Sequence, residues 1–118
     1  MTGLPYPVRL MGYGMRAPGN RVRGREVAGR VEAVGNAVTR LRPGNEVYGI
    51  GEGTVAEYAP ARADKLAPRP KNLTAAQAAA VPVSALTALQ ALRDRGQVQP
   101  GQQVLVIGAS GGVGTFAV

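Results

Sequence analysis

Residues 102–118 read QQVLVIGASGGVGTFAV, an apolar run that leads straight into a glycine-rich turn. The run at 104–107 is expected to be a buried parallel strand, because such strands are apolar on both faces. When a chain turns sharply after a strand and brings its backbone against an anionic pyrophosphate, side chains would collide, so glycine recurs there. The stretch therefore predicts the start of a dinucleotide-binding βα unit.

The glycines of this turn fit two registers. Gly108, Gly111 and Gly114 have GxxGxxG spacing, whereas Ala109, Gly111 and Gly114 fit GxGxxG with alanine in the first place. In either register the middle glycines permit close approach of the phosphate, and Gly114 lets the following helix pack. A tight turn without a ligand remains the alternative. The candidate cofactor-binding residues here are Gly108, Ala109, Gly111, Gly112, Val113 and Gly114.

Upstream, short segments of strand-like pattern alternate with turns. Strands are expected at 26–34, 46–50, 54–59 and 65–67, with turns at Gly35-Asn36 and Pro43-Gly44. Several short strands with close turns favour a small barrel or roll. Tyr48 and Tyr58 are expected to pack within it rather than to contact a ligand.

Beyond Pro70 the pattern becomes helical. Asn72 or Thr74 can cap a helix, and Thr74 with Gln77 has the spacing of a capping box. Pro82 should end that helix. A second helix is predicted from about 84 to 95, with an apolar face of Leu86, Leu89 and Leu92 and a stop at Gly96.

Composition excludes several kinds of chemistry. The 118 residues hold no Cys and no His, which rules out disulfides, thiolate nucleophiles and the usual zinc ligands in this chain.

The net charge is +7, and eight arginines lie between Arg9 and Arg42. Nucleic-acid binding is not favoured, because Tyr13 is the one stacking aromatic in that stretch; an acidic partner or a phosphate-bearing cofactor fits better. A cytoplasmic location is predicted, because the apolar runs are too short for a membrane span and the sequence lacks a signal-peptide pattern.

Five collinear motifs carry a family resemblance: GREVAGRVEAVGNAV, LRPGNEVYGI, GTVAEYA, AAAVPVSALTALQAL and QPGQQVLVIGASGGVGTFAV. They resemble the medium-chain dehydrogenase/reductase superfamily, and most of all its zinc-free quinone oxidoreductase branch. The resemblance implies a mixed α and β fold in two parts. Residues 1–83 would form a partial GroES-like β-barrel or roll. Residues 84–118 would form a linking helix, followed by the first strand and the start of the first helix of a Rossmann domain. The resemblance also implies NADP(H) as cofactor and a small quinone or enone as substrate.

The resemblance bears on the site in two ways. Zinc alcohol dehydrogenases of this superfamily carry a zinc-binding His-Glu pair where this chain has Arg25-Glu26, so no metal site is expected. Ser84, Thr87 and Ala88 match the segment near the nicotinamide, and Thr87 is the hydroxyl candidate there; Ser84 is at least as well explained as a helix N-cap. The resemblance assigns no catalytic residue and does not decide between NADH and NADPH.

Compared with that family, the chain is expected to be truncated at both ends and inactive alone. The alternative is a non-catalytic module that pairs with itself or with a related subunit, through an unpaired strand or the arginine-rich face.

Overall fold

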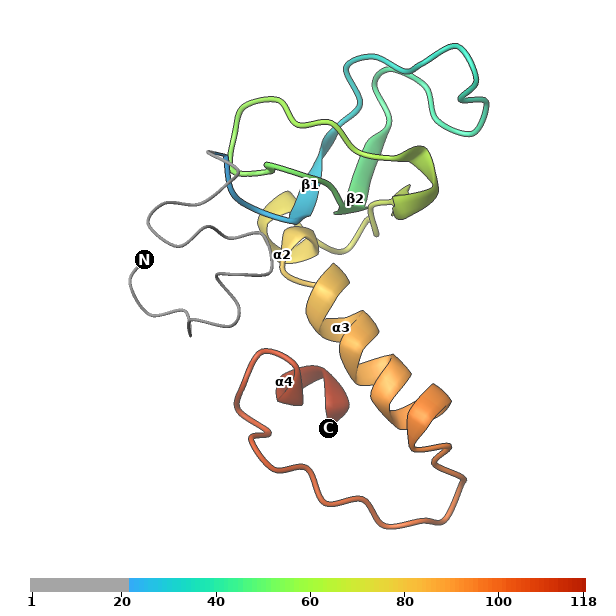
Figure 1. Cartoon of the computed structure of the whole chain (residues 1–118), viewed down its shortest axis with the longest axis vertical. Helices are drawn as coiled ribbons and strands as arrows, with labels where there is room; N and C mark the ends of the chain where they lie inside the picture. Colours follow the sequence, from blue (N-terminus) through green and yellow to red (C-terminus); the bar gives the residue numbers. More distant parts are fainter. Residues whose placement is uncertain (1–21) are drawn as a thin grey trace, which may run out of the picture.

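The computed structural model describes residues 22–118, and its centre is a small antiparallel sheet (Figure 1). Strands β1 (Glu26–Arg30), β2 (Glu46–Ile50) and β3 (Leu66–Pro68) lie in the order β1-β2-β3. The helical elements are the 3-10 turn η2 (Ala63–Lys65), α2 (Ala75–Ala79), α3 (Pro82–Leu89), the π-helical segment η3 (Gln90–Arg95) and α4 (Gly114–Ala117). The fold is thus mixed α and β, as predicted.

The β1–β2 pairing agrees with the sequence prediction except in length. β1 ends at Arg30, opposite Glu46, whereas the alternation of residues predicted a strand as far as 34. Two further backbone hydrogen bonds follow the β1–β2 pairing: the Val31 N–H donates to the Asn45 carbonyl at 2.9 Å, and the Gly44 N–H donates to the Val31 carbonyl at 2.8 Å. The chain then leaves β2 and turns, so residues 32–34 have no neighbouring strand with which to pair.

The predicted turn before β2 is confirmed. The Asn45 N–H donates to the Arg42 carbonyl at 3.1 Å, with Pro43 and Gly44 between them. Gly44 has φ +90°, which a type II turn requires at this position and which a residue with a side chain rarely adopts. The Asn45 side chain adds a bond of its own, since its Oδ1 accepts from the Arg42 N–H at 2.9 Å.

The strand predicted at 54–59 is wrong. The structure has bends there, and Tyr58, expected to pack in the barrel, is 75% exposed. Backbone bonds at the start of this segment, such as Val55 N–H to the Arg23 carbonyl at 2.8 Å, hold it near the chain that precedes β1. Tyr48 on β2 is half-buried and fits the predicted packing role.

The core lies where the sheet meets α2 and α3. Among the described residues, the buried apolar side chains are Leu41, Val47, Ala78, Pro82 and Ala88. Ala78 of α2 is completely buried, and α2 packs against β1 and β2. In Figure 1, α3 begins beside this contact and leads away from the sheet. The sheet and the segment after residue 96 are therefore connected through α3.

The capping box that the sequence predicted for α2 is confirmed, with Thr74 as the N-cap. Its Oγ1 accepts from the Gln77 N–H at 3.2 Å, while Gln77 Oε1 accepts from the Thr74 N–H at 2.9 Å. Pro82 occupies the first turn of α3, where proline costs no hydrogen bond, so this helix begins two residues earlier than predicted. The helical path ends at Gly96 as predicted, but Leu86 and Leu89 of its apolar face are 45% exposed.

The buried strand predicted at 104–107 is also wrong. The described part of the chain has no strand there, and Leu105 and Ile107 are 86% and 91% exposed. A parallel strand needs neighbours for its backbone groups and both of its faces, and none lies beside this segment. The short helix predicted after the glycine turn does form, as α4.

No helix within residues 22–118 combines the length and the apolar character needed to cross a membrane. The predicted division at residues 83 and 84 falls inside α3 and stays a prediction.

Candidate functional site

Residues 108–114, here named the glycine loop, fold back on themselves. Gly108 has φ +79° and its carbonyl accepts from the Gly111 N–H at 2.9 Å, which closes a tight turn. The Gly111 carbonyl then accepts both the N–H and the Oγ1 of Thr115, at 2.9 and 2.8 Å. The turn and the first residues of α4 thus form one hydrogen-bonded unit.

Gly114 is required by close packing within this unit. A Cβ at this position would lie 2.8 Å from the Ala109 Cα and still closer to the Gly108 carbonyl oxygen. The sequence predicted that Gly114 lets a helix pack on a strand. In the structure, Gly114 instead lets α4 pack on the turn that precedes it.

The glycine loop lies against α3. A Cβ on Gly112 would be 3.5 Å from the Ser84 Oγ, an ordinary contact distance. Figure 1 shows α4 beside the length of α3, and the two helices are in contact. Ser84 and the glycine loop therefore share one site.

Thr87 is one turn further along α3 and is exposed. Its Oγ1 donates to the Val83 carbonyl at 2.7 Å, so the hydroxyl proton is directed at the helix itself. The oxygen can still accept a hydrogen bond from a ligand.

Ser84 is not a helix N-cap, so that alternative is wrong. Val81 is the N-cap of α3, it has no side-chain oxygen, and Ser84 lies inside the helix. The acceptor comes from β1: Glu26 Oε1 receives the Val83 N–H at 3.0 Å. Sequence reasoning missed this contact. The available signal was a helix that starts at Val81-Pro82 without a capping residue and so needs an acceptor from elsewhere.

The glycine loop leaves several of its backbone N–H groups without a hydrogen bond. It contains no acidic side chain, and no hydrogen bond within residues 22–118 uses the backbone N–H groups of Ala109, Ser110 or Gly112. Consecutive N–H groups in a glycine-rich turn can bind a phosphate. The residues present therefore fit the pyrophosphate of a dinucleotide.

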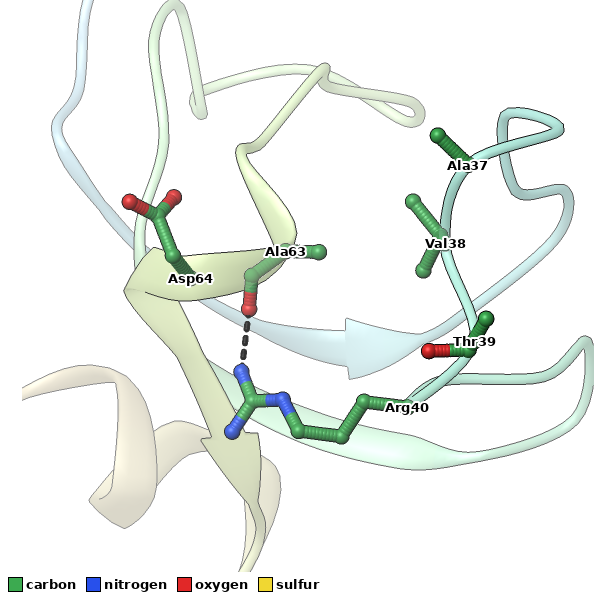
Figure 2. A pocket seen from close by; sticks show the side chains of 6 residues that line it. All are labelled: Ala37, Val38, Thr39, Arg40, Ala63 and Asp64. Carbon is green, nitrogen blue, oxygen red and sulfur yellow. Dashed lines mark hydrogen bonds between the residues drawn. The ribbon is translucent and has the colours of Figure 1, made fainter.

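A separate hollow lies between the loop before β2 and η2. Its lining residues are Ala37, Val38, Thr39, Arg40, Ala63 and Asp64 (Figure 2). The Arg40 guanidinium crosses it to donate to the carbonyls of Ala63 and, at 2.8 Å, Leu66. This arginine ties the loop to β3, and in Figure 1 these segments are far from α4, so the hollow is not part of the site.

Two exposed ion pairs perturb titrating groups. The hydrogen bond from Arg62 lowers the pKa of Asp64, and the bond from Arg93 lowers the pKa of Asp94 in the same way. Both carboxylates are therefore ionised at neutral pH and cannot donate a proton there. Within the described range, no group of three or more Asp, Glu, Cys or His side chains is placed to hold a metal ion.

Comparison with known proteins gives a family and several relatives. The family model of the alcohol dehydrogenase GroES-like domain matches residues 6–71. The chain is 45% identical, over 117 residues, to the pikromycin polyketide synthase component PikAII of Streptomyces venezuelae, which is 99% of this chain and 3% of that protein. It is 39% identical over 104 residues to the quinone-oxidoreductase homolog of Spinacia oleracea, covering 80% of this chain and 32% of the relative.

The chain is also similar to proteins of known structure. A native mycobacterial protein complexed with NADPH superimposes with a TM-score of 0.76 at 37% identity, covering 81% of this chain and 31% of that one. The CurK enoyl reductase superimposes with a TM-score of 0.78 at 28% identity, covering 94% and 34%. The chain thus spans about a third or less of each of these relatives, which include quinone oxidoreductases and enoyl reductases.

Proposed function

The chain belongs to the family of the alcohol dehydrogenase GroES-like domain, and from this premise we propose that it is part of an NAD(P)H-dependent enzyme that reduces a carbon–carbon double bond conjugated to a carbonyl. The observation that carries the proposal is the glycine loop, which leaves the backbone N–H groups of Ala109, Ser110 and Gly112 without a hydrogen bond and lies against α3 at Ser84. The similarity to a protein complexed with NADPH supports a nicotinamide cofactor, NADPH in particular.

For the substrate we propose an enoyl group, with a quinone as the second candidate. The CurK enoyl reductase matches 94% of the chain, whereas the quinone-oxidoreductase homolog matches 80%. The wider coverage favours the enoyl class. Both substrates would take a hydride from the reduced nicotinamide and a proton: the enoyl group would gain the hydride at the carbon β to its carbonyl and the proton at the α carbon, and the quinone would become a hydroquinone.

In this proposal, the chain's own residues bind the cofactor. The glycine loop would hold the pyrophosphate through its backbone N–H groups, and Ser84 and Thr87 would contact the cofactor from α3. When bound, the reduced nicotinamide would supply the hydride. No zinc is invoked, because the 118 residues hold no Cys or His to bind one. Residues 1–83 are proposed as the catalytic-domain part, and 84–118 as the linking helix and the start of the cofactor domain.

The test uses the native gene product that carries these residues, whatever its length. Oxidation of NADPH is followed with an enoyl thioester, and separately with a quinone. We expect turnover with the thioester, and no oxidation with either substrate would contradict the proposal. Turnover with the quinone alone would select the second candidate.

A matched pair of variants links that activity to the glycine loop. Gly112→Asp places a negative charge where the phosphate is expected, whereas Gly112→Asn adds a side chain of nearly the same size without charge. The KM for NADPH should be about tenfold higher in the aspartate variant than in the asparagine variant, because like charges repel. Equal KM values would show that the phosphate lies elsewhere.

A further inference from the structure

Glu26 lies at the junction between the sheet and α3. It is the first residue of β1, half-buried, and paired in register with Ile50 of β2. Its side chain extends from the sheet to the N-terminus of α3, where Oε1 accepts the Val83 N–H at 3.0 Å over a separation of 57 residues. This bond connects two parts of the fold that are remote in sequence.

The N-terminus of α3 lacks any local alternative to this bond. Val81 at the N-cap has no side-chain acceptor, and Pro82 has no N–H to satisfy. Val83 therefore presents the first free N–H of the helix, and Glu26 meets it with a carboxylate, whose negative charge also suits the positive end of the helix dipole.

The consequence extends to the glycine loop. Ser84 follows Val83 directly, and it is the residue whose Oγ lies 3.5 Å from where a Cβ on Gly112 would be. The helix end that Glu26 fixes to the sheet is thus the same end on which the glycine loop rests.

We propose that Glu26 is a positioning residue: by accepting the Val83 N–H, it fixes the start of α3 to the sheet and so sets where the glycine loop sits relative to the sheet. The proposal goes beyond the proposed reductase function, because it concerns how the site is held and not which ligand or substrate it takes.

The test uses the full chain and two readouts that need no cofactor. Because the sequence has no cysteine, spin labels on Arg30→Cys, at the end of β1, and on Gly112→Cys are the only two on the chain, and the distribution of distances between them reports where the glycine loop sits relative to the sheet. The second readout is hydrogen exchange of the Val83 amide.

Three substitutions are compared in that background. Glu26→Ala removes the acceptor and should speed exchange at Val83 about fivefold, the typical effect of losing a helix cap, and broaden the distribution of distances between the labels. Glu26→Gln keeps an oxygen acceptor and should restore most of both signals. Glu32→Ala, an exposed glutamate beyond the end of β1, is the matched control and should change neither.

Two outcomes would overturn the proposal: unchanged readouts in Glu26→Ala, or a Glu26→Gln variant as impaired as the alanine one. If Glu26→Ala does not fold, the comparison of Glu26→Gln with the parent still decides, because a glutamine that fails to preserve the signals refutes the acceptor role. Since neither readout involves turnover, a failed reductase assay leaves this result unaffected.

Discussion

At the scale of single residues, Gly114 is the position in the candidate site where a side chain is least tolerable. A Cβ there would lie 2.8 Å from the Ala109 Cα, and backbone atoms cannot rotate away. We predict that Gly114→Ala opens the turn and speeds exchange of the Thr115 amide about fivefold, a net loss of about 1 kcal/mol, since overpacking typically costs about 1–3 kcal/mol. The gain in helix propensity from alanine is smaller, about 1 kcal/mol.

The control for this prediction lies two residues earlier. A Cβ on Gly112 meets only the Ser84 Oγ, at 3.5 Å, so Gly112→Ala should leave exchange at Thr115 near the parent rate. Equal exchange rates in the two variants would mean that the loop does not pack as described. Amide exchange measured by NMR resolves both cases.

At the scale of elements, the capping box of α2 provides a test of local structure. Thr74→Ala removes the acceptor for the Gln77 N–H, and should lower the free energy of unfolding by about 1 kcal/mol. Because α2 buries Ala78 against the sheet, the loss should appear in global chemical unfolding and not only in fraying of the helix. Thr74→Ser keeps the oxygen and should recover most of the stability; an alanine variant as stable as the parent would contradict the role of the cap.

The elements also show which features the sequence could predict. The Thr74–Gln77 box and the Pro43-Gly44 turn involve residues within three or four positions of each other, and both are confirmed. The strand predicted at 104–107 depended on neighbouring strands that no local pattern can supply, and it is wrong. The strand predicted at 54–59 is wrong for the same reason, because alternation of side chains does not by itself provide a neighbouring strand to pair with.

In the candidate site, too, a local feature could be predicted from the sequence and a long-range contact could not. The tight turn was predicted from the glycine spacing, whereas the contact of Gly112 with Ser84 was not predicted. The capping of α3 by Glu26 could not be predicted, because it joins residues 57 positions apart. Whether the glycine loop binds a cofactor stays a prediction that the variants of Gly112 test.

At the scale of the whole molecule, the dominant surface feature of the C-terminal part is its exposed apolar side chains. Leu105, Ile107 and Val118 are 86%, 91% and 82% exposed, although residues of this kind are usually buried. Burying one such side chain is worth about 1.5–3 kcal/mol, so association that covers them is favourable. We predict that the 118-residue chain self-associates through this segment as its concentration rises.

The double variant Leu105→Lys with Ile107→Lys should weaken that association at least about tenfold, because two apolar groups are replaced by charges that repel their copies. Its melting temperature at low concentration should stay close to that of the parent, since both side chains are mostly in solvent. Val55→Lys, 74% exposed and outside this segment, is the matched control and should associate like the parent. Sedimentation velocity over a range of concentrations measures the effect, and a double variant that associates as strongly as the parent would place the contact elsewhere on the molecule.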